Sequence, residues 1–197
     1  METPTTLICA PLAAEIALIT DPDLRRFTEL GLIVAPAYFW TIAASTTGKY
    51  HPPDSLGQGG LVRHTRKVVY FAREFARGME CTPWLNELTA AALLHDLYKN
   101  GDNPDDRSRG MAHWSAHGLH ACRYLENRVL EGTPGVVLAS RPKIRDSVLK
   151  VFDLMSRHMG PFGGNAPRPC TREDWVLYMA DYTASRKFVN VDWNLIS

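Results

Sequence analysis

The stretch LTAAALLHDLYKNG, residues 88–101, changes from an apolar run to polar side chains over a few positions. Its first half is built from Ala and Leu, which favour a buried helix. The run then ends in His95 and Asp96, an imidazole beside a carboxylate, and Lys99 follows. Because a buried charge is costly unless it is paired or bound to a metal, this segment indicates an ion pair or a metal site.

Helical periodicity extends from this segment over the rest of the chain, and only the short GVVLAS, residues 135–140, is compatible with a strand. We therefore predict an all-α fold, a helical bundle. The Thr171–Asp174 pair resembles a capping box at the start of the last helix. The expected helices cover about 21–45 with a kink or break near Pro36, 61–79, 82–101, 112–130, 142–158 and 171–189.

The composition is that of an ordinary globular protein, with 45% apolar residues in 197. We expect one domain over residues 1–197, with residues 1–50 as an N-terminal helical cap. The formal charge of +1 gives no reason to expect stable DNA binding, and Pro36 interrupts the apolar run that comes closest to a membrane span. The scattered cysteines and the lack of a basic leader predict a cytoplasmic protein; the cysteines are Cys9, Cys81, Cys122 and Cys170.

Five predicted helices each carry a potential metal ligand on, or at the end of, an apolar face. Neutral imidazole and carboxylate are ligands that suit iron, manganese, cobalt, nickel or zinc. Cores of helical bundles are a natural place for such a site. For one helix, His113 and His117 both remain candidates, one turn apart. The full set is His64, His95 with Asp96, His117 or His113, His158 and Asp181.

The order H…HD…H…H…D resembles that of the HD-domain superfamily of metal-dependent phosphohydrolases. Five blocks resemble one bacterial or phage subgroup with extra histidines, and together they span residues 49–187. The dipeptide alone would be a weak signal, whereas the ordered set is specific. The blocks are KYHPPDSLGQGGLVRHT (49–65), AALLHDLYKNG (91–101), HGLHACRYL (117–125), SRHMGPF (156–162) and DYTASRK (181–187).

This resemblance implies a binuclear site, in which Asp96 bridges two divalent ions, magnesium being a further candidate. By position, His64 and Asp181 match ligands of the first ion, His95 and Asp96 match the pair that names the family, and His117 and His158 match the extra histidines of binuclear members. The chain departs from many of those relatives at position 98, where Tyr98 replaces glycine.

The activity that the resemblance implies is cleavage of a phosphate ester by a metal-activated hydroxide. The expected substrate is a small phosphorylated molecule: a nucleotide, a cyclic nucleotide or a short oligonucleotide. Asp96 and Lys99 are the expected catalytic residues, with Lys99 near the phosphate. Substrate contacts are expected from Lys49, His51, Arg63 and Arg186.

Two other functions stay open on the sequence. A few HD-like di-iron proteins share this architecture and cleave their substrates with oxygen, and an HD fold can also serve as a non-enzymatic ligand-sensing module. Trp114 and Phe162 lie near the candidate ligands in sequence and are candidates for lining a pocket. The oligomeric state is left open.

Overall fold

The computed structural model describes residues 9–101, 116–130 and 142–193, and these residues form helices and turns without a strand. The predicted all-α fold is therefore confirmed. The α-helices are α2 (Ala13–Ala17), α3 (Pro22–Ile33), α4 (Gly60–Gly78), α5 (Leu85–Leu94), α7 (His117–Leu125), α8 (Pro142–Arg157) and α9 (Arg172–Ala184). Short 3₁₀ turns are η1 (Ala10–Leu12), η2 (Ala37–Trp40), η3 (Pro53–Ser55), η4 (Thr82–Trp84) and η8 (Gly160–Phe162), and η6 (Glu126–Leu130) is a π-helical turn.

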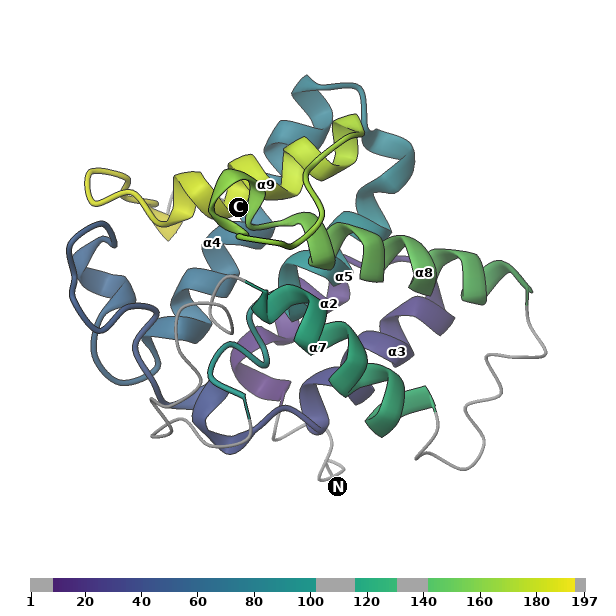
Figure 1. Cartoon of the computed structure of the whole chain (residues 1–197), viewed down its shortest axis with the longest axis horizontal. Helices are drawn as coiled ribbons and strands as arrows, with labels where there is room; N and C mark the ends of the chain where they lie inside the picture. Colours follow the sequence, from purple (N-terminus) through teal and green to yellow (C-terminus); the bar gives the residue numbers. More distant parts are fainter. Residues whose placement is uncertain (1–8, 102–115, 131–141, 194–197) are drawn as a thin grey trace.

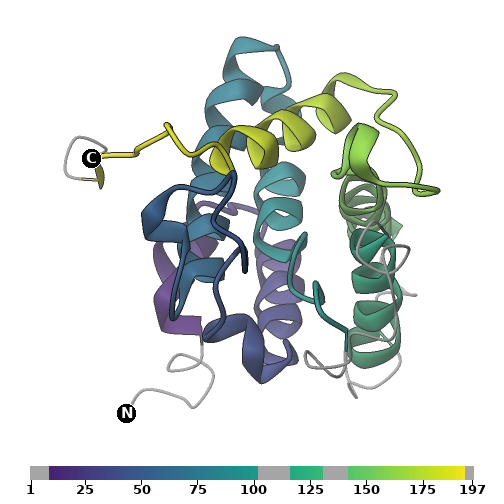
Figure 2. The same cartoon turned by 60° about the vertical axis from the view of Figure 1, so that its left-hand side comes forward.

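Helix α5 lies at the centre of the bundle. It packs between α4 and α8, with α3 against it as well (Figures 1 and 2). Helix α9 runs across this group and contacts α4, α5 and α8 (Figure 2). All residues of α5 from Leu88 to Leu94 are buried, since this helix is apolar on every side and other helices cover it.

Two helix starts follow the chemistry of their first residues. The Asp21 side chain accepts a hydrogen bond from the backbone N–H of Leu24, which caps α3. At the start of α9, Thr171 and Asp174 form the reciprocal bonds of a capping box, as the sequence predicts. This box fixes the helix that carries Asp181.

Several predicted boundaries are wrong. In the region expected over 21–45, the break predicted near Pro36 is confirmed, because α3 ends at Ile33 and Pro36 cannot continue the hydrogen-bond ladder. Only the short η2 follows the break, in place of a continued helix to residue 45. Helix α9 ends at Ala184 rather than near residue 189: the Ser185 hydroxyl and the Arg186 Nε both donate to the carbonyl of Tyr182, in place of a further helical turn. Residues 135–140 and the first part of the predicted 112–130 helix lie outside the described residues.

The helix expected over 82–101 is shorter at both ends. Thr82 and Pro83 belong to η4, and α5 ends at Leu94. Beyond Leu94 the backbone bonds shorten to three-residue turns, with Leu97 N to Leu94 O at 3.2 Å. The hydroxyl of Tyr38 accepts the Asn100 N–H at 3.0 Å and ties this turn to η2. His95 and Asp96 thus stand in a tight turn rather than on a regular helix.

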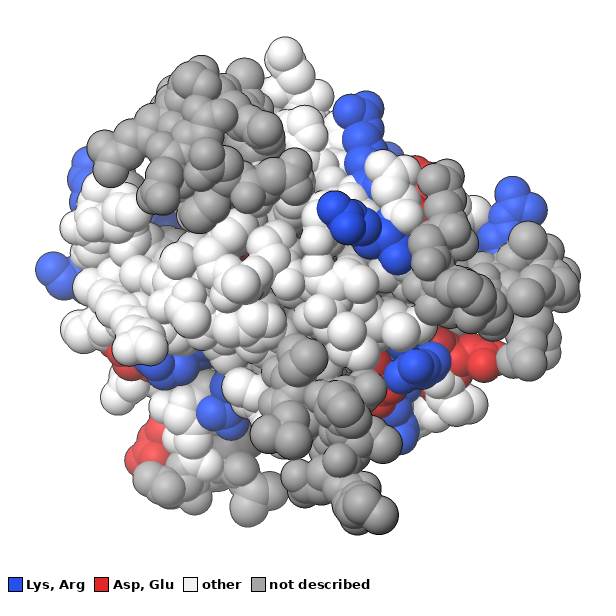
Figure 3. All heavy atoms as spheres, turned by 90° about the horizontal axis from the view of Figure 1, so that it is seen from below, with Lys and Arg blue, Asp and Glu red and all other residues white. Residues whose placement is uncertain are grey.

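The described helices include none with the length and apolar character that a bilayer crossing requires. Figure 3 views one face of the molecule, on which the described Lys and Arg side chains stand in small groups among uncharged residues. This face carries no continuous basic stripe within its described part, which agrees with the formal charge of +1.

Candidate metal centre

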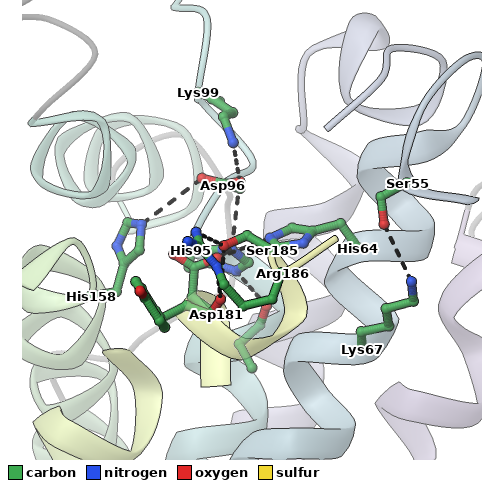
Figure 4. A network of polar contacts seen from close by, with 12 residues as sticks. Ser55, His64, Lys67, His95, Asp96, Lys99, His158, Asp181, Ser185 and Arg186 are labelled. Atoms are coloured by element: carbon green, nitrogen blue, oxygen red, sulfur yellow. Dashed lines mark hydrogen bonds and ion pairs between the residues drawn. The ribbon is translucent and has the colours of Figure 1, made fainter. Parts of the chain in front are cut away.

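Three helices, α4, α7 and α9, and the turns that follow α5 and α8 bring six ligand-type side chains to one place in the core. Figure 4 shows His64 of α4 on one side of Asp96, His158 on the other, and Asp181 of α9 beside His95. The imidazoles and the Asp96 carboxylate are almost entirely buried, and Asp181 is partly exposed. All the ligands expected from the sequence converge there: His64, His95, Asp96, His117, His158 and Asp181.

One group of donor atoms gathers around Asp181. Its Oδ1 lies 3.0 Å from His64 Nε2 and 3.8 Å from His95 Nε2. His95 Nε2 is also 3.6 Å from Asp96 Oδ2. His64, His95 and Asp181 together form a set that could hold a metal ion.

A second group gathers around the other oxygen of Asp96. His117 Nε2 lies 2.7 Å and His158 Nε2 3.9 Å from Asp96 Oδ1, and the two Nε2 atoms are 2.9 Å apart. At this spacing both imidazoles could bind one ion together with Asp96 Oδ1. The two oxygens of Asp96 therefore face different groups, the arrangement that a bridging carboxylate needs.

The histidine tautomers also fit a metal site. His95 Nδ1 donates to the carbonyl of Ala92 at 2.8 Å, and His158 Nδ1 donates to that of Met155 at 2.6 Å. A carbonyl only accepts, so the proton sits on Nδ1 and the lone pair on Nε2 faces the centre. In the described structure His95 Nε2 is buried with no hydrogen-bond partner. A metal ion would satisfy this orphaned acceptor.

Burial and charge set the protonation of the centre. Burial lowers the pKa of His158 to about 3, with the neighbouring imidazoles adding to the effect, and it also lowers the pKa of His95. Burial alone would raise the pKa of Asp96, but Lys99 and the imidazoles hold it well below its usual range. These histidines are therefore neutral and Asp96 ionised at pH 7, the states in which they bind metals.

Two further predicted residues lie at the centre. The Lys99 ammonium is 2.7 Å from Asp96 Oδ2, and although burial opposes it, this pairing raises the Lys99 pKa. The His51 ring centroid is 5.4 Å from that of His64. Burial, reinforced by His64 and Lys99, lowers the pKa of His51 to about 4, so it offers a neutral ring rather than a charge.

The other predicted substrate contacts lie further out or are engaged elsewhere. The Arg63 guanidinium donates to the carbonyls of Asp54 and Leu56, at 2.5 and 3.1 Å, and so supports the loop before α4. The Lys49 ammonium lies 5.1 Å from the Tyr50 ring centroid, and Arg186 lies 5.3 Å from the same ring. Phe162 is in η8, next to the end of α8, whereas His113 and Trp114 lie outside the described residues.

Three residues that position the site were not predicted. The fully buried Lys67 pairs with Asp54 at 2.5 Å and lies 3.5 Å from the Ser55 hydroxyl, which fixes η3 to α4 (Figure 4). A Cβ on Gly118 would stand 2.1 Å from the Met155 carbonyl, so only glycine lets α7 approach α8 this closely. Tyr98 stacks on Tyr124 of α7 with ring centroids 4.4 Å apart.

Each of these had a faint signal. Lys67 stands one turn from His64 and is followed by the apolar Val68 and Val69, and Gly118 directly follows His117. Tyr98 differs from the glycine of many relatives. None of the three signals distinguishes a buried role from an exposed one without the packing of the other helices.

A family model described as HD domain matches residues 61–186. This range begins at the start of α4 and ends just after α9, so it encloses all six candidate ligands. No curated protein and no solved structure matches the chain.

Proposed function

The chain belongs to the HD-domain family of metal-dependent phosphohydrolases, and from that premise we propose that it hydrolyses a phosphate ester at a centre of two divalent ions. One observation supports the proposal most strongly. Asp96 Oδ2 lies 3.6 Å from His95 Nε2, which belongs to the group around Asp181, and Asp96 Oδ1 lies 2.7 and 3.9 Å from the Nε2 atoms of two further histidines, His117 and His158.

The proposed ligands divide between the two groups. His64, His95, Asp181 and Asp96 Oδ2 would hold the first ion, and Asp96 Oδ1, His117 and His158 the second. When bound, divalent ions polarise phosphoryl oxygens and bring the pKa of a coordinated water toward neutrality. The donor set is compatible with iron, manganese, cobalt, nickel, zinc or magnesium.

The chain's own residues shape the site for an anion. Only Asp96 and Asp181 contribute negative charge among the six ligands, so two divalent ions leave an excess of positive charge. The Lys99 ammonium adds to it and lies close enough to Asp96 to reach a phosphate bound there. His51 presents a neutral imidazole beside His64, suited to a hydrogen bond with an ester or phosphate oxygen.

The proposed substrates are nucleotides, cyclic nucleotides or short oligonucleotides, cleaved as phosphomonoesters or phosphodiesters. The test uses metal-free protein reloaded with each candidate ion and assayed on nucleoside monophosphates, cyclic nucleotides and bis(p-nitrophenyl) phosphate. We expect metal-dependent turnover that Asp96→Asn lowers by about a thousandfold, the loss of several kcal/mol of stabilisation.

Asp153→Asn is the matched control, because Asp153 is a half-exposed carboxylate on α8 paired with Arg157. It should retain full activity. Metal-filled protein that turns over none of these esters, or turnover that survives Asp96→Asn, would rule out the proposal.

A further inference from the structure

Three large aromatic side chains are exposed beside the metal centre rather than buried. Tyr50 is 52%, Phe162 62% and Tyr182 39% exposed. Each is carried by a segment that also reaches the centre: Tyr50 precedes His51, Tyr182 follows Asp181, and Phe162 lies in the turn that follows α8. Three of the exposed rings therefore lie on segments that also reach the candidate site.

A guanidinium connects two of these rings. Arg186 lies 4.0 Å from the Tyr182 ring centroid and 5.3 Å from that of Tyr50. Its Nε donates to the Tyr182 carbonyl at 3.0 Å and its Nη2 to the Ser185 hydroxyl at 2.9 Å, which hold it in place. Figure 4 shows Arg186 close to Asp181 and Ser185.

The third ring is aligned with the second. The Phe162 and Tyr182 rings are nearly parallel, at 9°, with centroids 6.3 Å apart. Tyr178 lies behind Tyr182 with ring centroids 5.9 Å apart, which supports the orientation of Tyr182. Tyr50, Phe162, Tyr182 and Arg186 thus form one surface, here named the aromatic rim.

Such a surface suits a flat ring. Exposed aromatic faces and arginine planes bind planar aromatic groups by stacking, and one base stacked on one side chain contributes roughly tenfold to a hundredfold in affinity. The Arg186 charge at the same place favours a ligand that also carries an anion. Sugar or aliphatic phosphates would gain the charge interaction alone.

We propose that the aromatic rim is the subsite that selects substrates carrying a planar aromatic ring, as the base of a nucleotide does, over other phosphate esters. This inference rests on the proposed hydrolase function, since it assigns the part of the substrate that lies outside the metal centre. Tyr182 is the central residue of the subsite, because it contacts both Phe162 and Arg186.

The test compares two esters that differ only by the base, adenosine 5′-monophosphate and ribose 5-phosphate. We expect the metal-loaded protein to favour the adenosine ester by at least about tenfold in kcat/KM. Tyr182→Leu should remove most of that preference by raising KM for the adenosine ester alone, and Tyr182→Phe, which keeps the ring, should restore it.

Trp84→Leu is the control for loss of an exposed ring. Trp84 lies in η4, which precedes the start of α5, whereas His95 follows the end of α5, and the Trp84 ring packs with Lys150. It should leave the preference intact. Equal kcat/KM for the two esters, or an equal loss on both with Tyr182→Leu, would overturn the inference.

A binding measurement separates this inference from the proposed function. Calorimetry with adenosine and ribose needs no hydrolysis. We expect adenosine to bind at least about tenfold more tightly than ribose, and we expect Tyr182→Leu to abolish this difference. If the metal-loaded protein hydrolyses none of the monoesters and diesters used to test the proposed function while adenosine still binds in this way, the hydrolase proposal fails and the ring subsite stands. Adenosine that binds no better than ribose would overturn the subsite.

Discussion

Asp96 is the residue on which both ligand groups depend. Its two oxygens lie within reach of His95 on one side and of His117 on the other, at 3.6 and 2.7 Å. The same carboxylate also holds the Lys99 ammonium, at 2.7 Å. A metal ion at the proposed centre would therefore compete with Lys99 for one oxygen, Oδ2, and this competition can be measured.

Replacing Lys99 should separate metal binding from turnover. In Lys99→Met no ammonium neutralises Asp96, so we expect tighter metal binding. We also expect kcat to fall by about 100-fold, because a positive charge near the phosphate is lost. Metal titrations and steady-state kinetics check both effects. Lys99→Arg, which keeps the charge, should retain most of kcat. A loss of metal affinity in Lys99→Met would contradict this role.

At the scale of the helices, the second ligand group depends on how closely α7 approaches α8. Gly118→Ala would place a methyl group 2.1 Å from the Met155 carbonyl and 2.7 Å from His158 Nδ1. We expect a loss of about 1–3 kcal/mol in the free energy of unfolding and weaker metal binding, because the helices must separate.

The matched control is Gly78→Ala in the last turn of α4, where a Cβ meets nothing within 4 Å. It should be neutral or slightly stabilising. Urea unfolding and metal titration of both variants check the comparison. Equal effects in the two variants would show that the close approach of α7 to α8 determines neither stability nor metal affinity.

A second contact between elements is made by Lys67, which ties η3 to α4 through Asp54. Lys67→Met should lower the free energy of unfolding by about 1–2 kcal/mol, since the half-exposed Asp54 carboxylate is partly screened by water. In a double-mutant cycle with Asp54→Asn the losses should be less than additive. Strict additivity would mean that the pair contributes nothing.

The sequence was sufficient to predict those parts of the fold and site that depend on local patterns. The apolar run into His95, the capping box at Thr171 and the regular spacing on α4 each determine a helix from neighbouring residues. The end of α5 at Leu94 was not predictable, because the turn that follows is held by Tyr38, far away in the chain. The roles of Lys67 and Gly118 likewise arise only from packing between helices.

For the whole molecule, the buried histidines predict a loss of stability in acid. His158 and His51 have pKa values lowered to about 3 and 4, mainly by burial, and that of His95 is also lowered. Between the usual histidine pKa near 6.5 and these values, the unfolded chain binds protons that the folded chain does not. Stability therefore falls with decreasing pH, by about 1.4 kcal/mol per pH unit for each such histidine.

Urea unfolding of metal-free protein at pH 7.5 and pH 5 tests this prediction. We expect the midpoint to be clearly lower at pH 5. Burial would raise the pKa values of Asp96 and Asp181, but Lys99 holds the first low and His64 the second. These carboxylates therefore add a further loss of stability only below about pH 4. Equal or greater stability at pH 5 would show that the imidazoles are not buried as neutral groups.

The proposed metal centre joins six ligands from three helices and two turns around two ions. Anomalous X-ray diffraction from crystals of manganese-loaded protein tests this claim most directly. We predict two peaks on either side of Asp96, one beside His64, His95 and Asp181 and the other beside His117 and His158. Anomalous density elsewhere, or none at Asp96, would contradict the account.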